Sequence, residues 1–317
     1  MATDNQLFAN GRISVLSTRL FGQDKFSRLA ECSSTDECIR LLIESGIGGG
    51  VSESGDCDAL LRAEMNSLLQ LLKDLCFDNN LLAYLRCRYD YVNAKVLMKS
   101  KYMRTDGVPY CFQNVACNPD DMQQAFVNDD YSNCSMAMAH ACRSVDEAFA
   151  SGNRSPQVID RLLDSAYYYD MQMCAYRSSG SLLKELYAWD VDTTNLMLIV
   201  RARNAGLTAE DYDELIIRRG SIRAVTLNAL FENNNAEVLP EKYHSFYSVC
   251  VQSSDVQRAE SEQKKGRYAI IENSMDMLDV HPVVDYFLKK CEEIDKIRYI
   301  FISVKNGVNK EIIKENL

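Results

Sequence analysis

The residue types best suited to metal chemistry are the twelve cysteines and three histidines of the chain. Structural zinc sites usually place cysteine ligands about two to four residues apart. Here five residues separate Cys32 from Cys38 and Cys111 from Cys117, and no Cys-x-x-Cys occurs. The opening MATDNQLFANGR also lacks the apolar stretch of a secretory signal, so we do not expect disulfides. We predict reduced thiols that pack as small hydrophobic side chains, and no metal or other cofactor.

Two further motifs match only part of a catalytic or binding site. Glu241-x-x-His244 has the carboxylate–histidine spacing of di-iron helical bundles, which need a second such pair and further glutamates. Neither His140 nor His281 follows a carboxylate by three residues, so we expect Glu241 and His244 to be exposed polar groups of a helix. The glycine run 48–50 lacks the Gly-Lys-Ser/Thr of a phosphate-binding loop, and we predict an ordinary loop there.

Three acidic residues stand at nearly equal intervals along the chain. Asp90, Asp192 and Glu293 are 102 and 101 residues apart, close to a third of the 317 residues. One interpretation is a cluster of converging acids. The alternative is that each carboxylate ties its own helix to a neighbouring helix or to an arginine, because a buried carboxylate must be paired. We favour the alternative, in which these acids are structural anchors of a repeat.

The sequence around the three acids repeats one pattern. Mainly apolar residues recur six before the acid and one, four and eight after it, which is one face of a helix. Asn93 and Asn195 both lie three residues after the acid, whereas Lys296 breaks this match. Three copies at even spacing indicate triplication of a helical unit of about a hundred residues. The predicted long helices are 84–103, 186–206 and 287–307, and the predicted units are 1–107, 108–208 and 209–317.

Each predicted long helix runs into a glycine that basic residues precede. Cations near the C-terminus of a helix and glycine just beyond it are the expected end of a helix. The repeat presents the basic residues equivalently, so they are candidate interface residues for an acidic partner, although such charges are more often solvated helix ends. The glycines are Gly107, Gly206 and Gly307, and the basic residues are Lys99, Lys101, Arg104, Arg201, Arg203 and Lys305.

The remaining sequence also favours helices. Five prolines and fourteen glycines are too few for a sandwich or barrel with many tight turns. Four segments carry helix-start signals. In two of them a short polar residue is followed directly by proline, and in the other two it is followed by an acidic residue three positions later. They are Ser34-x-x-Glu37, Asn118-Pro119, Ser155-Pro156 and Thr208-x-x-Asp211. We therefore predict an all-α protein.

The charge argues against a nucleic-acid partner, and the hydropathy argues against a membrane-spanning helix. The net charge of −10 argues against nucleic-acid binding, because affinity for phosphate comes from lysine and arginine. The strongest apolar run, residues 196–200, is far shorter than the ~20 residues of a membrane-spanning helix. The residues thus favour a helical interaction module that contains no catalytic constellation.

At these repeats the sequence resembles the C subunit of archaeal and bacterial V-type (A-type) ATPases, a family related to the d subunit of the eukaryotic vacuolar proton pump. The segment 11–46 is similar to the family's N-terminal pattern of an Arg-led helix and a second, capped helix. The segment 84–101 resembles its aromatic-Asp-x-x-Asn-x-(Lys/Arg) helix. The segment 282–317 matches most specifically, and its Glu-x-x-x-Ile-Arg element adds Arg298 to the candidate anchors. The region 225–275 matches only loosely.

The resemblance implies three similar helical-bundle units arranged as a pseudo-threefold funnel. It also implies a non-catalytic rotor subunit, peripheral on the cytoplasmic face of the membrane. Such a subunit links the ring of proteolipid subunits to the D and F subunits of the central stalk. It transmits torque between ATP hydrolysis or synthesis and proton or sodium transport, and it has no small-molecule substrate. Two alternatives stay open: a helical-repeat scaffold of another assembly, and a helical-bundle metalloprotein.

Overall fold

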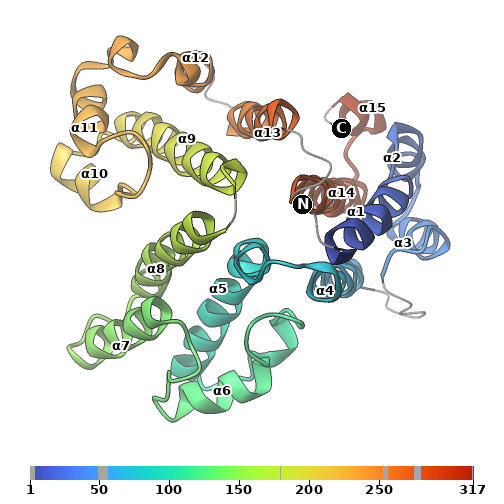
Figure 1. Cartoon of the computed structure of the whole chain (residues 1–317), viewed down its shortest axis with the longest axis horizontal. Coiled ribbons are helices and arrows are strands. Elements are labelled where there is room, and N and C mark those ends of the chain that lie inside the picture. The colour runs from blue at the N-terminus through green and yellow to red at the C-terminus, as the bar shows by residue number, and fades with distance from the viewer. Residues whose placement is uncertain (1–3, 49–55, 179, 253–255, 275–279, 316) are drawn as a thin grey trace. The chain divides into compact units, whose positions relative to one another are not determined.

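The structure, a computed structural model, describes residues 4–48, 56–178, 180–252, 256–274, 280–315 and 317 (Figure 1). In these ranges every regular element is a helix and no strand occurs, which confirms the predicted all-α class. Nowhere in the same ranges does a helix combine the length and the apolar character of a membrane span. The chain divides into two compact units, Met1–Asn133 with Asp276–Leu317, and Cys134–Met275. The three repeat boundaries, 1–107, 108–208 and 209–317, stay a prediction.

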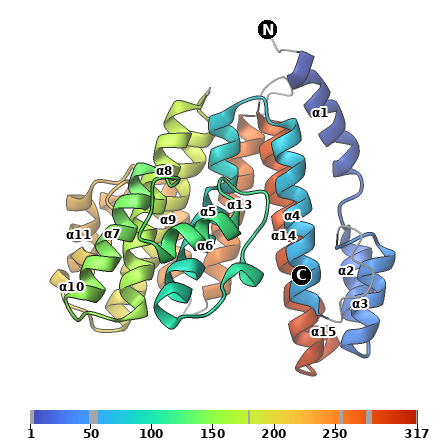
Figure 2. The same ribbon diagram turned by 90° about the horizontal axis from the view of Figure 1, so that it is seen from below.

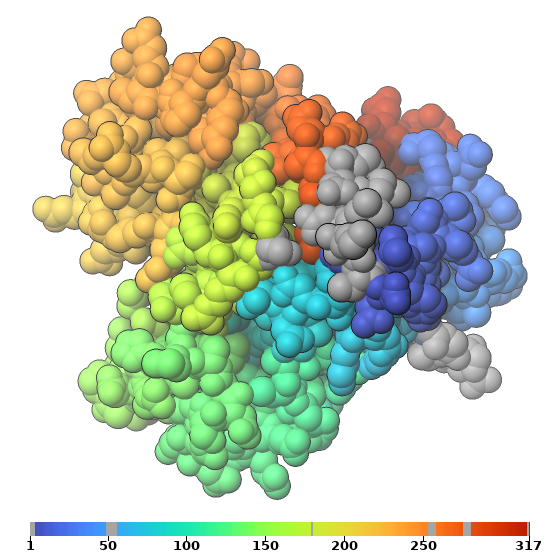
Figure 3. All heavy atoms as spheres, viewed as in Figure 1, coloured from blue at the N-terminus to red at the C-terminus, as the bar shows by residue number. Residues whose placement is uncertain are grey.

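The first unit is built around its last long helix, α14 (His281–Lys305), which packs against α1, α2, α3, α4 and α15. Figure 2 shows α4 and α14 side by side, and the surface of α1–α3 is blue in Figure 3. The remaining helices of this unit are α1 (Asp4–Ser17), α2 (Gln23–Ala30), α3 (Thr35–Glu44), α4 (Cys57–Leu75), α5 (Asn79–Met103), η1 (Val108–Tyr110), α6 (Pro119–Val127) and α15 (Lys310–Glu315).

The second unit is built in the same way around α9 (Leu182–Asn204), which packs against α8, α11, α12 and α13. The remaining helices of this unit are α7 (Met136–Ala150), α8 (Pro156–Arg177), α10 (Ala209–Leu215), α11 (Ala224–Asn233), η2 (Ala236–Val238), η3 (Glu241–Tyr243), α12 (His244–Gln252) and α13 (Val256–Asn273). The helices α5, α9 and α14 confirm the three predicted long helices, although α9 and α14 each end two residues before the predicted range.

The predicted helix starts are confirmed at the level of hydrogen bonds. The Ser34 hydroxyl accepts a bond from the Glu37 N–H at 3.3 Å. The return bond differs from a strict capping box, because the Glu37 carboxylate accepts from the N–H of Ser33 at 2.7 Å. In α10 both bonds of the box form between Thr208 and Asp211. The helices α6 and α8 begin at their prolines and are capped by the side chains of Asn118 and Ser155.

The predicted helix stops are confirmed at two of the three glycines. Gly206 and Gly307 have φ angles of 69° and 68°, the left-handed conformation that glycine adopts easily. Gly107 does not end α5, because the helix finishes one residue before Arg104, which itself has a φ of 55°. Gly107 instead permits a close approach, since an ideal Cβ there would lie 2.4 Å from Ser100 Oγ.

Trp189 on α9 is the centre of the second unit's core. Its ring stacks on Tyr243 with ring centroids 5.5 Å apart, and its Nε1–H donates to the Gln263 carbonyl on α13 at 2.9 Å. The helix α13 can approach this closely because residue 266 is glycine. An ideal Cβ at Gly266 would lie 2.0 Å from the indole ring. The absence of a side chain at this one position therefore sets the spacing of α9 and α13.

We predict that Gly266→Ala destabilises the protein by about 1–3 kcal/mol, because the new methyl group overlaps the buried indole. Gly11→Ala in α1 is the matched control. Nothing lies within 4 Å of an ideal Cβ at Gly11, and alanine is the better helix former by about 1 kcal/mol. Urea unfolding followed by tryptophan fluorescence measures both variants. An equal response of the two variants would contradict the proposed role of Gly266.

Candidate functional site

A buried asparagine on α9 holds the loop that follows this helix. Asn195 is fully buried. Its Nδ2 donates to the carbonyl of Ile217 at 2.9 Å, and its Oδ1 accepts from the N–H of the same residue at 2.9 Å. The side-chain amide thus bonds both the N–H and the C=O of one loop residue. Without it, these two backbone groups would give up their hydrogen bonds to water on folding and gain none in return.

Asn93 on α5 makes the same pair of bonds in the first unit. Its Nδ2 donates to the carbonyl of Phe112 and its Oδ1 accepts from the Phe112 N–H, both at 2.8 Å. Phe112 lies six residues before the N-cap of α6, and Ile217 lies six residues before the N-cap of α11. The two asparagines that coincide in the sequence repeat therefore perform the same structural task.

Asp192, three residues before Asn195, accepts hydrogen bonds from the segment that leads into the next short helix, α11. Asp192 accepts from the N–H groups of Ser221 and Ile222 at 3.2 and 3.0 Å, and from the Tyr243 hydroxyl at 2.5 Å. Gly220 leaves room for this carboxylate, since an ideal Cβ would lie 2.1 Å from Asp192 Oδ1. The helix α11 has no side-chain cap of its own, and Asp192 instead fixes the two residues that precede its N-cap.

Asp90 has the equivalent partner in the first unit. Its carboxylate accepts from the N–H of Ala116 at 2.7 Å, two residues before the N-cap of α6, and lies 3.7 Å from Arg86. Ser221 likewise lies two residues before the N-cap of α11. Asp90 and Asp192 thus each bond the segment that enters the short helix following their own long helix.

Glu293 makes a related contact, but with the opposite end of the chain. It accepts from the N–H of Phe21 at 2.7 Å, just before the uncapped start of α2. Lys290 forms ion pairs with both Glu293 and Glu64, the latter at 2.7 Å, and the Glu64 carboxylate also accepts from the Gly48 N–H. The three charged side chains are only 3–12% exposed, so they form a nearly dry network between α4, α14 and α2.

The carboxylates of this network determine the charge state of the buried amine. Burial by itself lowers the pKa of Lys290, but Glu293 and Glu64 outweigh burial and raise the pKa above its ordinary value. Lys290 therefore stays protonated across the physiological pH range. It supplies the counter-charge shared by two buried acids.

Basic side chains hold the other ends of the same short helices. Beyond the end of α6, Lys101 contacts Asp129 at 2.5 Å and the Tyr131 hydroxyl at 2.7 Å. At the end of α11, Arg203 donates to the carbonyls of Leu230 and Phe231 at 3.4 and 3.2 Å. A cation at the C-terminus of a helix satisfies terminal carbonyls and complements the helix dipole.

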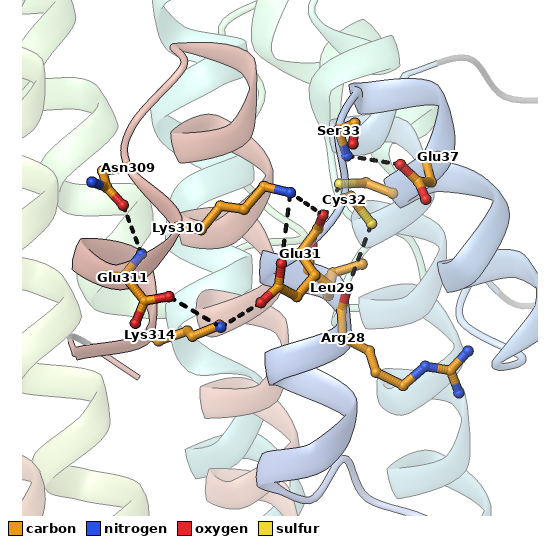
Figure 4. A network of polar contacts seen from close by, with 11 residues as sticks. Arg28, Leu29, Glu31, Cys32, Ser33, Glu37, Asn309, Lys310, Glu311 and Lys314 are labelled. Atoms are coloured by element: carbon orange, nitrogen blue, oxygen red, sulfur yellow. Dashed lines mark hydrogen bonds and ion pairs between the residues drawn. The ribbon is translucent and has the colours of Figure 1, made fainter.

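The end of α2 is held by the C-terminal helix of the chain. Lys310 donates to the carbonyl of Glu31, the C-cap of α2, at 2.5 Å, and Lys314 pairs with the Glu31 carboxylate (Figure 4). Lys314 and Lys310 also lower the pKa of this exposed carboxyl. The helices α2, α6 and α11 are therefore each fixed at both ends by side chains of, or just beyond, a long helix. We call these three the clamped helices.

Sequence reasoning did not single out Lys290, Glu64 or Lys310, nor α2 as the third clamped helix. One signal for α2 lies in the apolar residue four positions after each N-cap. Phe26, Met122 and Leu227 occupy this position in the three clamped helices, and all are buried.

The predicted interface cations fall into two groups. Lys101 and Arg203 are used within the clamps, as described above. Arg104, Arg201 and Lys305 are exposed, and Lys99 is half-buried. The candidate anchor Arg298 is partly exposed and lies 3.6 Å from both Asp58 and Asp295. Whether the exposed cations contact a partner stays a prediction.

His244 and two of the cysteines first considered for chemistry serve the fold. The ring of His244 bonds the carbonyl of Leu239 at 2.9 Å. Burial raises the pKa of Cys38 and Cys57 to about 12, which keeps these thiols protonated. No group of histidine, cysteine or acidic residues in the described ranges has the geometry to hold a metal ion. The predicted loop at 48–50 lies mostly outside the described residues.

We predict that Asn195→Ala destabilises the protein by about 2–3 kcal/mol, because it leaves both backbone groups of Ile217 without their partner. Asn233→Ala is the matched control. Asn233 is exposed and, among the described residues, its side chain bonds only the Ala229 carbonyl, so its loss should cost less than about 0.5 kcal/mol. Denaturant unfolding of the two variants decides between them, and similar midpoints would refute the role given to Asn195.

We predict that Lys290→Met costs about 3–5 kcal/mol, because it leaves Glu64 and Glu293 buried without a counter-charge. The neighbouring Lys289 pairs with Asp285 at 2.7 Å but is 48% exposed, so Lys289→Met should change stability by less than about 1 kcal/mol. Thermal unfolding measures both variants. A small effect at position 290 would show that the network does not need its cation.

Comparison with known proteins gives this scaffold a family. Residues 9–316 match the family described as ATP synthase (C/AC39) subunit. The A-type ATP synthase C subunit of Methanosarcina mazei is 23% identical over 99% of this chain and 93% of that protein. The same protein of Methanosarcina barkeri is 22% identical with equal coverage, and that of Desulfurococcus sp. is 27% identical over 42% of this chain and 38% of its own length. Because the family match spans nearly the whole sequence, the chain belongs to the ATP synthase (C/AC39) subunit family.

Proposed function

We propose that the chain is a non-catalytic central-stalk subunit of a rotary V- or A-type ATPase. The family match over residues 9–316 carries this proposal, and the relatives named as the C subunit of A-type ATP synthase support it. In this role the chain links the proteolipid ring in the membrane to the D and F subunits of the central stalk. It lies peripherally on the cytoplasmic face and transmits torque between ATP turnover and ion transport.

The clamped helices suit a part that carries torque. Each is held at both ends by charged or polar side chains, and the contacts of α6 recur in α11. A helix fixed at both ends resists rotation relative to its neighbours more than a helix that packs through apolar contacts alone. We further propose that the three repeats form the pseudo-threefold funnel that the sequence resemblance implies.

The exposed cations Arg104, Arg201 and Lys305 are the proposed contacts with neighbouring subunits, together with the half-buried Lys99. Lys101 and Arg203 are used inside their own units, where Lys101 bonds residues just beyond α6 and Arg203 bonds the end of α11. Acidic segments of the partner proteins would complement the exposed group.

Purification from native membranes through a tag on this chain should recover the proteolipid ring and the D and F subunits. The triple variant Arg104→Glu, Arg201→Glu, Lys305→Glu should fold normally and lower ATP-driven ion pumping by roughly tenfold or more, because it places like charges against acidic partners. The control is Arg154→Glu, which reverses an exposed cation outside the candidate set. Recovery without the ring and stalk proteins would contradict the proposed function. Unchanged pumping by the triple variant would contradict only the contacts assigned to these cations.

A further inference from the structure

A groove of about 190 Å³ lies between α2 and α3 in the first unit. Apolar side chains of Phe21, Leu29 and Leu41 line it. Lys25 and Arg28 stand on the side of α2, and Glu44 stands on the side of α3. The groove therefore has a mixed lining: a small apolar patch, positive charge on the side of α2 and negative charge on the side of α3.

Neither cation of the groove is neutralised within the described part of the chain. Lys25 lies 4.8 Å from the ring centroid of Phe21 and makes no ion pair there. Arg28 uses its backbone carbonyl to accept from the Cys32 thiol, while its guanidinium has no carboxylate partner. Figure 4 shows the guanidinium of Arg28 pointing away from the cluster of Glu31, Lys310 and Lys314. Two cations without a carboxylate partner among the described residues therefore stand beside the apolar patch of the groove.

The fold of the clamped helices does not require these cations. Lys25 and Arg28 lie three and six residues after the N-cap of α2. At the same two positions α6 has Asp121 and Gln124, and α11 has Thr226 and Ala229. The clamps themselves use other residues in all three helices, so the charge of α2 is a property of its outer surface.

We propose that the groove between α2 and α3 binds an acidic amphipathic segment of a neighbouring protein in the assembly. A carboxylate of that segment pairs with Lys25 and Arg28, and an apolar side chain beside the carboxylate covers Phe21, Leu29 and Leu41. Glu44 repels an acid on the opposite side, so the carboxylate faces α2 and the bound direction is fixed. The neighbour is a subunit of the rotary ATPase, and in this respect alone the inference rests on the proposed function.

The charge arrangement favours a protein segment over an anionic lipid surface. A flat layer of lipid phosphates would meet the exposed Asp24 and Glu44 as well as the two cations, which weakens its attraction. A single segment can place one carboxylate beside the cations and keep other acids away from Glu44. An arginine beside an apolar pocket is also the kind of residue on which binding energy concentrates.

Zero-length carbodiimide crosslinking of the complex purified from native membranes tests the proposal. This reagent joins an amine and a carboxylate only when they are in direct contact. Mass spectrometry should identify an amide between Lys25 and an aspartate or glutamate of another subunit that has an apolar residue beside it. A crosslink of Lys25 to a second copy of this chain, to its own chain only, or to nothing would overturn the proposal.

Charge reversal supplies the matched variants. Arg28→Glu should reduce the Lys25 crosslink by roughly tenfold or more, whereas Arg40→Glu, exposed on α3 but outside the groove, should leave it unchanged. Replacing the crosslinked aspartate or glutamate of the partner subunit with lysine should restore assembly with the Arg28→Glu chain. Equal losses in both variants would overturn the proposal, as would binding to phosphatidylserine vesicles that Arg28→Glu abolishes. If the chain still co-purifies with the ring and stalk but Lys25 gives no crosslink to another protein, this inference fails and the proposed function stands.

Discussion

The structure depends on the need to satisfy backbone polar groups where a loop turns back against a long helix. At these turns the N–H and C=O groups are shielded from water and cannot bond to a helix or sheet of their own. Asn93 and Asn195 supply both partners of one loop residue, and Asp90 and Asp192 receive the next N–H groups. These bonds fix the loop and so position the start of the short helix that follows.

Both units use the same backbone hydrogen bonds with different apolar residues, which explains why the structural repeat is kept although the sequences of the units are only weakly similar. The asparagine bonds backbone atoms, so the bonded residue is Phe112 in one unit and Ile217 in the other. The cation at the far end bonds a carboxylate and a hydroxyl in one unit and two carbonyls in the other. In the core of the second unit, the large side chain of Trp189 packs where Gly266 has none. What repeats is therefore a small set of polar contacts, and only a few residues make them.

This division explains what the sequence could predict. The long helices, their caps and the spacing of Asp90 and Asp192 all depend on side chains close in sequence, and periodicity indicates them. The bonded loops could not be found, because they follow the asparagines by 19 and 22 residues and share no residue type. The partner of Glu293 was further out of reach, since α2 starts after a glycine that provides no side-chain cap. The cations at helix ends were visible, but only the fold shows that Lys101 and Arg203 turn inward.

The pairing of α2 with α14 and α15 has a consequence for biosynthesis. The contacts of Phe21 with Glu293 and of Glu31 with Lys314 join residues 272 and 283 positions apart. At roughly 5–20 residues per second, a ribosome needs on the order of tens of seconds to translate the intervening chain. The second unit, 134–275, is continuous and can fold while translation proceeds. The first unit cannot be completed before its last helices are made, so the surfaces of α1–α4 that pack against α14 stay uncovered until then.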